Sequence, residues 1–127
     1  MSRTQPQAKR ETIVGRVEEI PPGSVRIVPV GKFGVGVFNV DGQYYALNNY
    51  CPHRGAPVCR GYRVGLSVPG DEPYSVQWIR DGEFLRCPWH GWEWEIATGR
   101  SATYPGKAVR AYRVRVEDGL VILEGVA

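Results

Sequence analysis

The chain has few of the residues that usually carry enzyme chemistry: only two histidines and three cysteines among its 127 residues. It also has no run of about 18 consecutive apolar residues, so the sequence predicts no transmembrane helix. Its first residues lack the apolar segment of a secretory signal peptide, which favours a cytoplasmic location. The cysteines are odd in number, and in a reducing compartment Cys/His spacing points to metal or catalytic chemistry more than to a disulfide framework.

An excess of charge of one sign is absent as well. The net charge of +3 at pH 7 is too small to indicate nucleic acid binding. The sequence also lacks a glycine-rich strand-turn-helix signature for flavin or nicotinamide, because the segment GKFGVG at 31–36 is flanked by strand patterns. What remains is the composition of an ordinary globular protein, with 43% hydrophobic residues and a length that fits one domain.

The pattern of residues predicts an all-β chain. Residues 1–11 are polar and basic without periodicity and are predicted to form a disordered arm. The remaining chain is rich in Val, Ile, Tyr and Trp, is punctuated by Gly and Pro, and has no helical period. Asp-Gly pairs at 41–42, 81–82 and 118–119 predict hairpin turns, since a type I′ turn needs positive φ at both central residues. The predicted strand pairs are VGVFNV with QYYALN, YSVQWIR with EFLRC, and VRAYRVRVE with LVILE.

Two short stretches contain both histidines and two of the three cysteines. They read YCPHRGAPVC at 50–59 and CPWHG at 87–91. Thiolate and imidazole are good ligands for zinc, iron and copper. A single buried Cys or His is more often a packing residue, but two matched loops favour a metal site. Pro after each Cys removes a backbone N–H, and a nearby Gly lets backbone N–H groups approach an anionic centre.

The ligand spacing separates two kinds of metal site. A structural zinc module is the simplest alternative, but its like ligands usually pair as C-x₂₋₄-C and H-x₃₋₅-H. Here each loop supplies one of each type, as Cys51-x-His53 and Cys87-x₂-His90. Mixed loops suit a two-iron cluster, because each iron then ties both loops together. The zinc module stays open as a remote alternative.

The paired motif, with its surroundings CPHRG and CPWHGW, resembles the Rieske iron-sulfur domain over nearly the whole chain. The resemblance implies one [2Fe-2S] cluster per chain, with Cys51 and Cys87 on the inner iron and His53 and His90 on the outer iron. It implies a Rieske-like antiparallel β sandwich or barrel with a small cluster-binding subdomain of two metal loops. The domain would occupy 12–127, and its cluster-binding part about 49–95.

The sequence departs from the family in two places. The segment between the two motifs is longer than the family's usual spacing, which predicts an inserted hairpin at about 61–84. Members from respiratory and photosynthetic complexes carry an extra disulfide between the loops, but the matching positions here are Ala56 and Trp89. The third cysteine, Cys59, is interpreted as a small buried thiol.

The histidine count separates a carrier from an enzyme. Oxygenase subunits of this family need a second iron on two His and a carboxylate, and both histidines are already assigned. The resemblance therefore implies a Rieske-type ferredoxin of the low-potential group associated with ring-hydroxylating oxygenases. Such a protein passes single electrons from a reductase to an oxygenase or similar terminal enzyme, without nucleic acid or membrane partners. The alternative is a stable small Rieske subunit of a larger oxidoreductase of the oxygenase or nitrite-reductase type.

The second motif also carries an expectation about the reduction potential. High-potential members continue His-Gly-Ser-x-Tyr, and the two hydroxyls donate hydrogen bonds that raise the potential. Trp92 and Trp94 stand at these positions here and are expected in the core. We therefore expect a potential near the low end of the Rieske range of about −150 to +300 mV.

Overall fold

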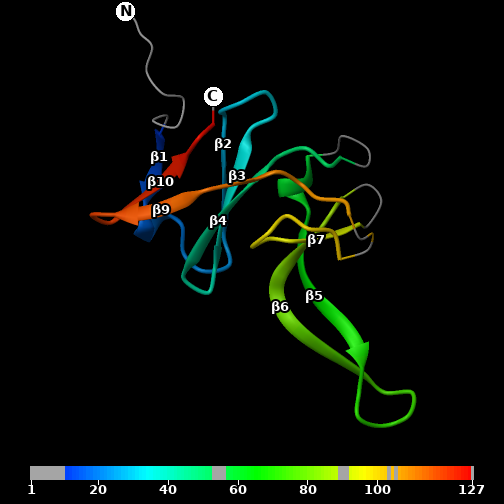
Figure 1. Cartoon of the computed structure of the whole chain (residues 1–127). Helices are drawn as coiled ribbons and strands as arrows, with labels where there is room; N and C mark the ends of the chain where they lie inside the picture. Colours follow the sequence, from blue (N-terminus) through cyan, green and yellow to red (C-terminus); the bar gives the residue numbers. More distant parts are fainter. Residues whose placement is uncertain (1–10, 53–56, 89–91, 103, 105, 127) are drawn as a thin grey trace, which may run out of the picture.

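The computed structural model describes residues 11–52, 57–88, 92–102, 104 and 106–126, which form three antiparallel sheets (Figure 1). The terminal sheet has the strand order β1 (Glu11–Arg16), β10 (Leu120–Glu124), β9 (Val114–Glu117). The central sheet has the order β2 (Val25–Val28), β3 (Val35–Val40), β4 (Gln43–Asn48), β8 (Ala111–Tyr112). The third sheet has the order β5 (Tyr62–Pro69), β6 (Val76–Arg86), β7 (Glu93–Glu95).

The all-β prediction is confirmed. Within the described residues, helix is limited to two short 3₁₀ turns, η2 (Val17–Glu19) and η3 (Val58–Arg60). In the same part of the chain, no helix is long and apolar enough to cross a membrane. Strand β1 begins at Glu11, the last residue of the N-terminal segment 1–11 that is predicted to be disordered. Residues 1–10 lie outside the described residues.

Two of the three predicted Asp-Gly hairpins are present. Asp41 and Gly42 have φ of 52° and 92° and connect β3 to β4. Asp118 and Gly119 have φ of 54° and 75° and connect β9 to β10. Both pairs meet the positive-φ requirement that made Asp-Gly a turn signal.

The predicted hairpin at Asp81-Gly82 is wrong. The segments YSVQWIR and EFLRC do not pair with each other, because both belong mainly to the single strand β6, which pairs with β5. Leu66 pairs with Ile79 and Val64 pairs with Phe84, so residues 80–83 bulge opposite the single residue Gly65. A Cβ on Gly65 would lie 2.5 Å from the carbonyl oxygen of Ile79, so the missing side chain makes room for the bulge.

The central sheet is buried on both faces, which explains why β3 is buried at its first five positions. Val37 and Ala46 face the core shared with the terminal sheet, whereas Phe38 and Leu47 face the core shared with the third sheet. This alternation follows from the two-residue period of a strand. The result is a layered β structure in which the central sheet lies between two cores, one shared with the terminal sheet and one shared with the third sheet.

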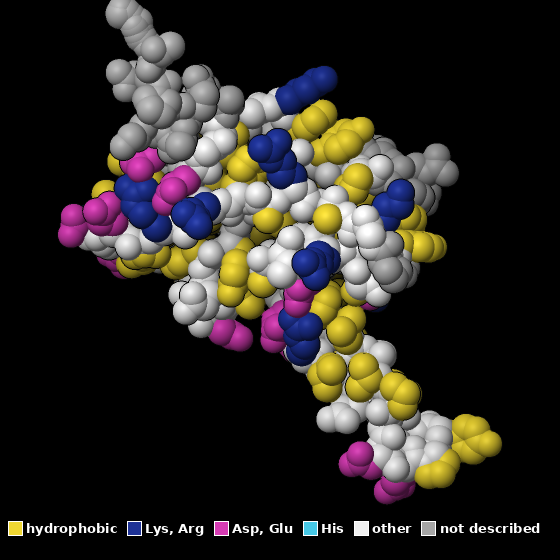
Figure 2. Space-filling view, viewed as in Figure 1, with side chains coloured by type: hydrophobic (Ala, Val, Ile, Leu, Met, Phe, Trp, Pro, Cys, Tyr) yellow, Lys and Arg dark blue, Asp and Glu magenta, His cyan; other side chains and the backbone are white. Residues whose placement is uncertain are grey.

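The β5–β6 hairpin extends away from the rest of the molecule (Figure 1). It overlaps the segment at about 61–84 where an inserted hairpin is predicted, and we call the part from Leu66 to Ile79 the arm. Apolar side chains line the arm on the visible face (Figure 2), and Tyr74, Val76 and Trp78 are among its exposed residues. The predicted cluster-binding interval, 49–95, contains the whole third sheet and Cys51, Cys59 and Cys87.

Candidate metal centre

Two of the four predicted ligands, Cys51 and Cys87, are placed by the structure in the same core. Cys51 follows the end of β4, and Cys87 directly follows β6. Their exposed fractions are 0% and 1%, and both belong to the core between the central and third sheets. None of the three cysteines forms a disulfide. Sequence-distant sulfur atoms are thus brought into one apolar environment.

The other two predicted ligands, His53 and His90, lie outside the described residues, as do Ala56 and Trp89. Among the residues that are described, no group of three or more His, Cys, Asp or Glu side chains could hold a metal ion. The four-ligand set therefore stays a prediction, with its two cysteines placed by the structure.

The first cysteine loop is closed at its base by Asn49. The backbone N–H of Cys59 donates to Asn49 Oδ1 at 2.9 Å, while the N–H of Asn49 donates to the carbonyl oxygen of Gly34, also at 2.9 Å. Asn49, two residues before Cys51, thus connects the end of the loop to Gly34, the residue directly before strand β3. Asn49 was not among the residues predicted from the sequence, although an Asn at the start of a loop is a known signal for side-chain to backbone bonding.

The second cysteine loop is also closed by a hydrogen bond at its base. The N–H of Cys87 donates to the carbonyl oxygen of Trp92 at 2.8 Å, which continues the pairing of β6 with β7. Trp94 is fully buried, whereas Trp92 is half-buried and stacks on Tyr104 with ring centroids 4.0 Å apart. The expectation that both tryptophans belong to the core is met fully by Trp94 and in part by Trp92.

The third cysteine has the properties of a packing residue. Cys59 is 1% exposed, and its thiol donates to the carbonyl oxygen of Leu47 at 3.4 Å. Burial raises the pKa of Cys59 to about 12, and a hydrogen bond with the backbone of Gly36 opposes this shift. The thiol therefore stays neutral at pH 7, unlike a thiolate ligand, which fits its interpretation as a small buried thiol.

Two buried nitrogen atoms of the described residues have no hydrogen-bond partner. They are Trp94 Nε1, in the core that contains Cys51 and Cys87, and Arg63 Nη1. The remaining donors of Arg63 are used, since Nε and Nη2 both donate to the carbonyl oxygen of Gly82. Trp94 has only one donor, so its entire hydrogen-bonding capacity is unmet.

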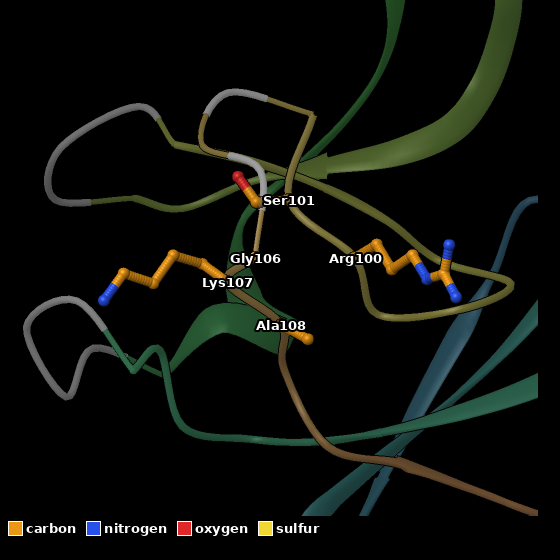
Figure 3. Close-up of a pocket in the computed structure, with 5 residues that line it drawn as sticks. All are labelled: Arg100, Ser101, Gly106, Lys107 and Ala108. Atoms are coloured by element: carbon orange, nitrogen blue, oxygen red, sulfur yellow. The ribbon is translucent and has the colours of Figure 1, made fainter.

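A surface hollow of about 490 Å³ is formed by the segment that follows β7. It is lined by Arg100, Ser101, Gly106, Lys107 and Ala108 (Figure 3). The side chains of Arg100 and Lys107 point away from each other, so the two positive charges do not converge on one position.

Comparisons with known proteins identify relatives of two lengths. Residues 10–113 match the Rieske [2Fe-2S] domain family. Apoptosis-inducing factor 3 of Mus musculus is 29% identical over 119 residues, which make up 93% of this chain, but the chain spans only 17% of that protein. The ferredoxin component of naphthalene 1,2-dioxygenase/salicylate 5-hydroxylase systems from a Ralstonia species is 26% identical over 109 residues, 85% of this chain and 88% of that protein.

A solved structure shares the fold over nearly the whole chain. A chain in the complex of reduced oxygenase and oxidized ferredoxin in carbazole 1,9a-dioxygenase superposes with a TM-score of 0.70 and 26% identity. The match covers 91% of this chain and 93% of that chain.

Proposed function

Because the chain belongs to the Rieske [2Fe-2S] domain family, we propose that it carries single electrons from a reductase to an oxygenase or similar terminal enzyme. The observation that supports this most directly is the burial of Cys51 and Cys87 in one core, at the bases of the two loops that contain the predicted ligands. The family implies one [2Fe-2S] cluster per chain, and when bound this group accepts and releases one electron.

The described residues fit such a cluster. Two buried sulfur atoms that no disulfide uses are the donors that an iron-sulfur cluster requires. The buried N–H of Trp94 has no acceptor within the described part of the chain, and cluster sulfur atoms in the same core would provide one. We propose Cys51 and Cys87 as ligands of the inner iron, and His53 and His90 as ligands of the outer iron.

A carrier is favoured over an enzyme by the relatives of similar length. The Ralstonia protein, of which the chain spans 88%, is named as a ferredoxin component and not as an oxygenase. With both histidines assigned to the cluster, no histidine is left for a second iron site. The donor and acceptor would accordingly be separate proteins, and the proposed location is the cytoplasm.

The alternative of a stable small subunit is favoured by one observation, the exposed apolar side chains of the arm. Tyr74, Val76 and Trp78 are all exposed, and clustered apolar surface of this kind is typical of a lasting protein contact. A free carrier elutes from a sizing column as a small protein and dissociates from its partners. A subunit copurifies in fixed ratio with a larger chain when it is isolated from its native cells.

The proposed transfer can be tested with purified components of an aromatic-ring dioxygenase system. A reductase with NADH should bleach the visible absorption of the carrier, and addition of the oxidized terminal oxygenase should restore it. The Cys87→Ala protein serves as the control, because it should lack the absorbing group. A protein that contains the cluster but is neither reduced by any such reductase nor reoxidized by the oxygenase would contradict a carrier function in systems of this class.

A further inference from the structure

The indole nitrogen of Trp94 is the most unusual polar atom of the described core. Trp94 is 0% exposed, and its Nε1 has no hydrogen-bond partner among the residues that the structure describes. A buried N–H without an acceptor is costly, and in native proteins such groups are rare enough to call for an explanation. An aromatic or aliphatic side chain of similar size would fill the same space without this cost.

The strand register places Trp94 beside one of the predicted ligands. Leu85 on β6 pairs with Trp94 on β7, and two residues further the N–H of Cys87 donates to Trp92. Because side chains two positions apart point to the same face of a strand, Cys87 and Trp94 are diagonal neighbours on one face of the third sheet. Long aromatic side chains span this diagonal.

We infer that the Nε1–H of Trp94 donates a hydrogen bond to a sulfur atom of the cluster's cysteine-bound half, and that this bond raises the reduction potential. The inference rests on the proposed function, since it requires the cluster. The physical reason is charge: sulfur in a reduced cluster carries more negative charge, so a donor stabilises the reduced state more than the oxidized state.

This assignment revises the expectation drawn from the second motif. That expectation considered only hydroxyl donors, and neither Trp92 nor Trp94 has a hydroxyl group. The structure shows that Trp94 brings a buried N–H to the second of these positions. The chain thus has one hydrogen-bond donor at these positions although it has no hydroxyl there. Trp94 acts as a donor to a cluster sulfur and not as a relay for electrons.

The test removes the N–H while the bulk of the side chain is kept. Trp94→Phe removes the donor but shortens a fully buried side chain, so a second variant carries 3-benzothienylalanine at 94, which has sulfur in place of the N–H and nearly the same shape. The matched control is Trp78→Phe on the arm. It removes an indole N–H that donates to Asp81 Oδ1 at 2.8 Å. Protein-film voltammetry at pH 7 measures the potential of each cluster-loaded protein.

Both variants at 94 should shift the potential to a more negative value, while Trp78→Phe should leave it unchanged. A tenfold loss in the equilibrium constant for reduction, the size that we expect for one such bond, equals about 59 mV for one electron. In D₂O, the iron–sulfur stretching bands of the wild-type resonance Raman spectrum should shift, and part of that shift should be missing from both variants at 94. If Trp94 had only a structural role, its N–H would contribute nothing to the shift in D₂O. The variants at 94 would then show the same shift as the wild type.

The outcomes separate this inference from the proposed function. If the benzothienylalanine protein binds its cluster and keeps the wild-type potential, the inference is overturned while the carrier function stands. If the wild-type protein contains no iron-sulfur cluster, the proposed function fails, and the inference fails with it.

Discussion

Asn49 and Cys59 are joined across the base of the first cysteine loop, where the N–H of Cys59 donates to Asn49 Oδ1 at 2.9 Å. The contact uses the backbone of Cys59 and leaves its thiol to pack against the central sheet. The position of Cys59 and its side chain therefore have different roles. The first holds the loop that contains Cys51, and the second fills space in the core.

Replacing Asn49 by Leu should weaken the cluster site more than it weakens the fold. The substitution leaves the N–H of Cys59 without its acceptor, which costs about 1–3 kcal/mol for a buried group. We expect faster loss of the visible absorption when the protein is incubated with an iron chelator. Asn49→Asp keeps an acceptor oxygen at the same position and is the matched control. Equal rates for wild type and the Leu variant would show that this hydrogen bond does not hold the loop.

Replacing Cys59 by Ser should leave the cluster and its spectrum intact. A serine hydroxyl can donate to the carbonyl oxygen of Leu47 as the thiol does. Because burial raises the pKa of Cys59 to about 12, the wild-type thiol should also resist alkylation at pH 8 until the protein unfolds. Absorption spectra of the variant and mass spectrometry after alkylation check both points. A folded Cys59→Ser protein without visible absorption would show that the ligand assignment is wrong.

Replacing Gly36 by Ala should destabilise the protein through the same thiol. A Cβ at position 36 would lie 2.6 Å from Cys59 Sγ, which is too close for two nonbonded atoms. We expect a loss of about 1–3 kcal/mol in the free energy of unfolding, as is usual for overpacking in a core. The same Cβ would lie 2.7 Å from Cys59 Cβ, so the double variant Gly36→Ala/Cys59→Gly, which removes both atoms, should recover part of this loss. Strictly additive effects in urea unfolding of the metal-free proteins would contradict this contact.

Acid sensitivity should depend on Glu95, at the end of β7. A hydrogen bond from Thr98 and a second from Arg80 hold the pKa of Glu95 below its ordinary value of 4.5. A lowered pKa in the folded state adds stability that is complete above the unfolded-state value and is lost as the pH falls through the folded-state value. Thr98→Val should therefore lower the free energy of unfolding at pH 7 slightly, by less than about 1 kcal/mol for this partly exposed carboxylate. The difference from wild type should shrink below pH 4.5, and a difference that grows there would contradict the account.

The sequence predicted most of the fold because its strongest signals are local. The turns at Asp41 and Asp118 depend only on two adjacent residues, and both are present. Asp81-Gly82 carries the same local signal but forms a bulge, since Gly65 on the neighbouring strand leaves room for it. No pattern within β6 alone reveals that partner.

The candidate site shows the same division between local and long-range information. The ligand types of Cys51 and Cys87 are readable from their motifs, and the structure places both in one core. The loop-closing bond of Asn49 and the unpaired N–H of Trp94 depend on tertiary neighbours, so neither was predicted. Asn49 becomes part of the site through its hydrogen bond to Cys59, and Trp94 through its burial in the same core as Cys51 and Cys87.

The central claim, a [2Fe-2S] cluster held by the two matched loops, is tested most directly by metal and sulfide analysis of anaerobically purified protein. The account predicts two irons and two acid-labile sulfides per chain, and loss of both when Cys51, His53, Cys87 or His90 is replaced by Ala. Cys59→Ser should keep the full content and serves as the control. Stoichiometric zinc without sulfide in the wild-type protein would contradict the account.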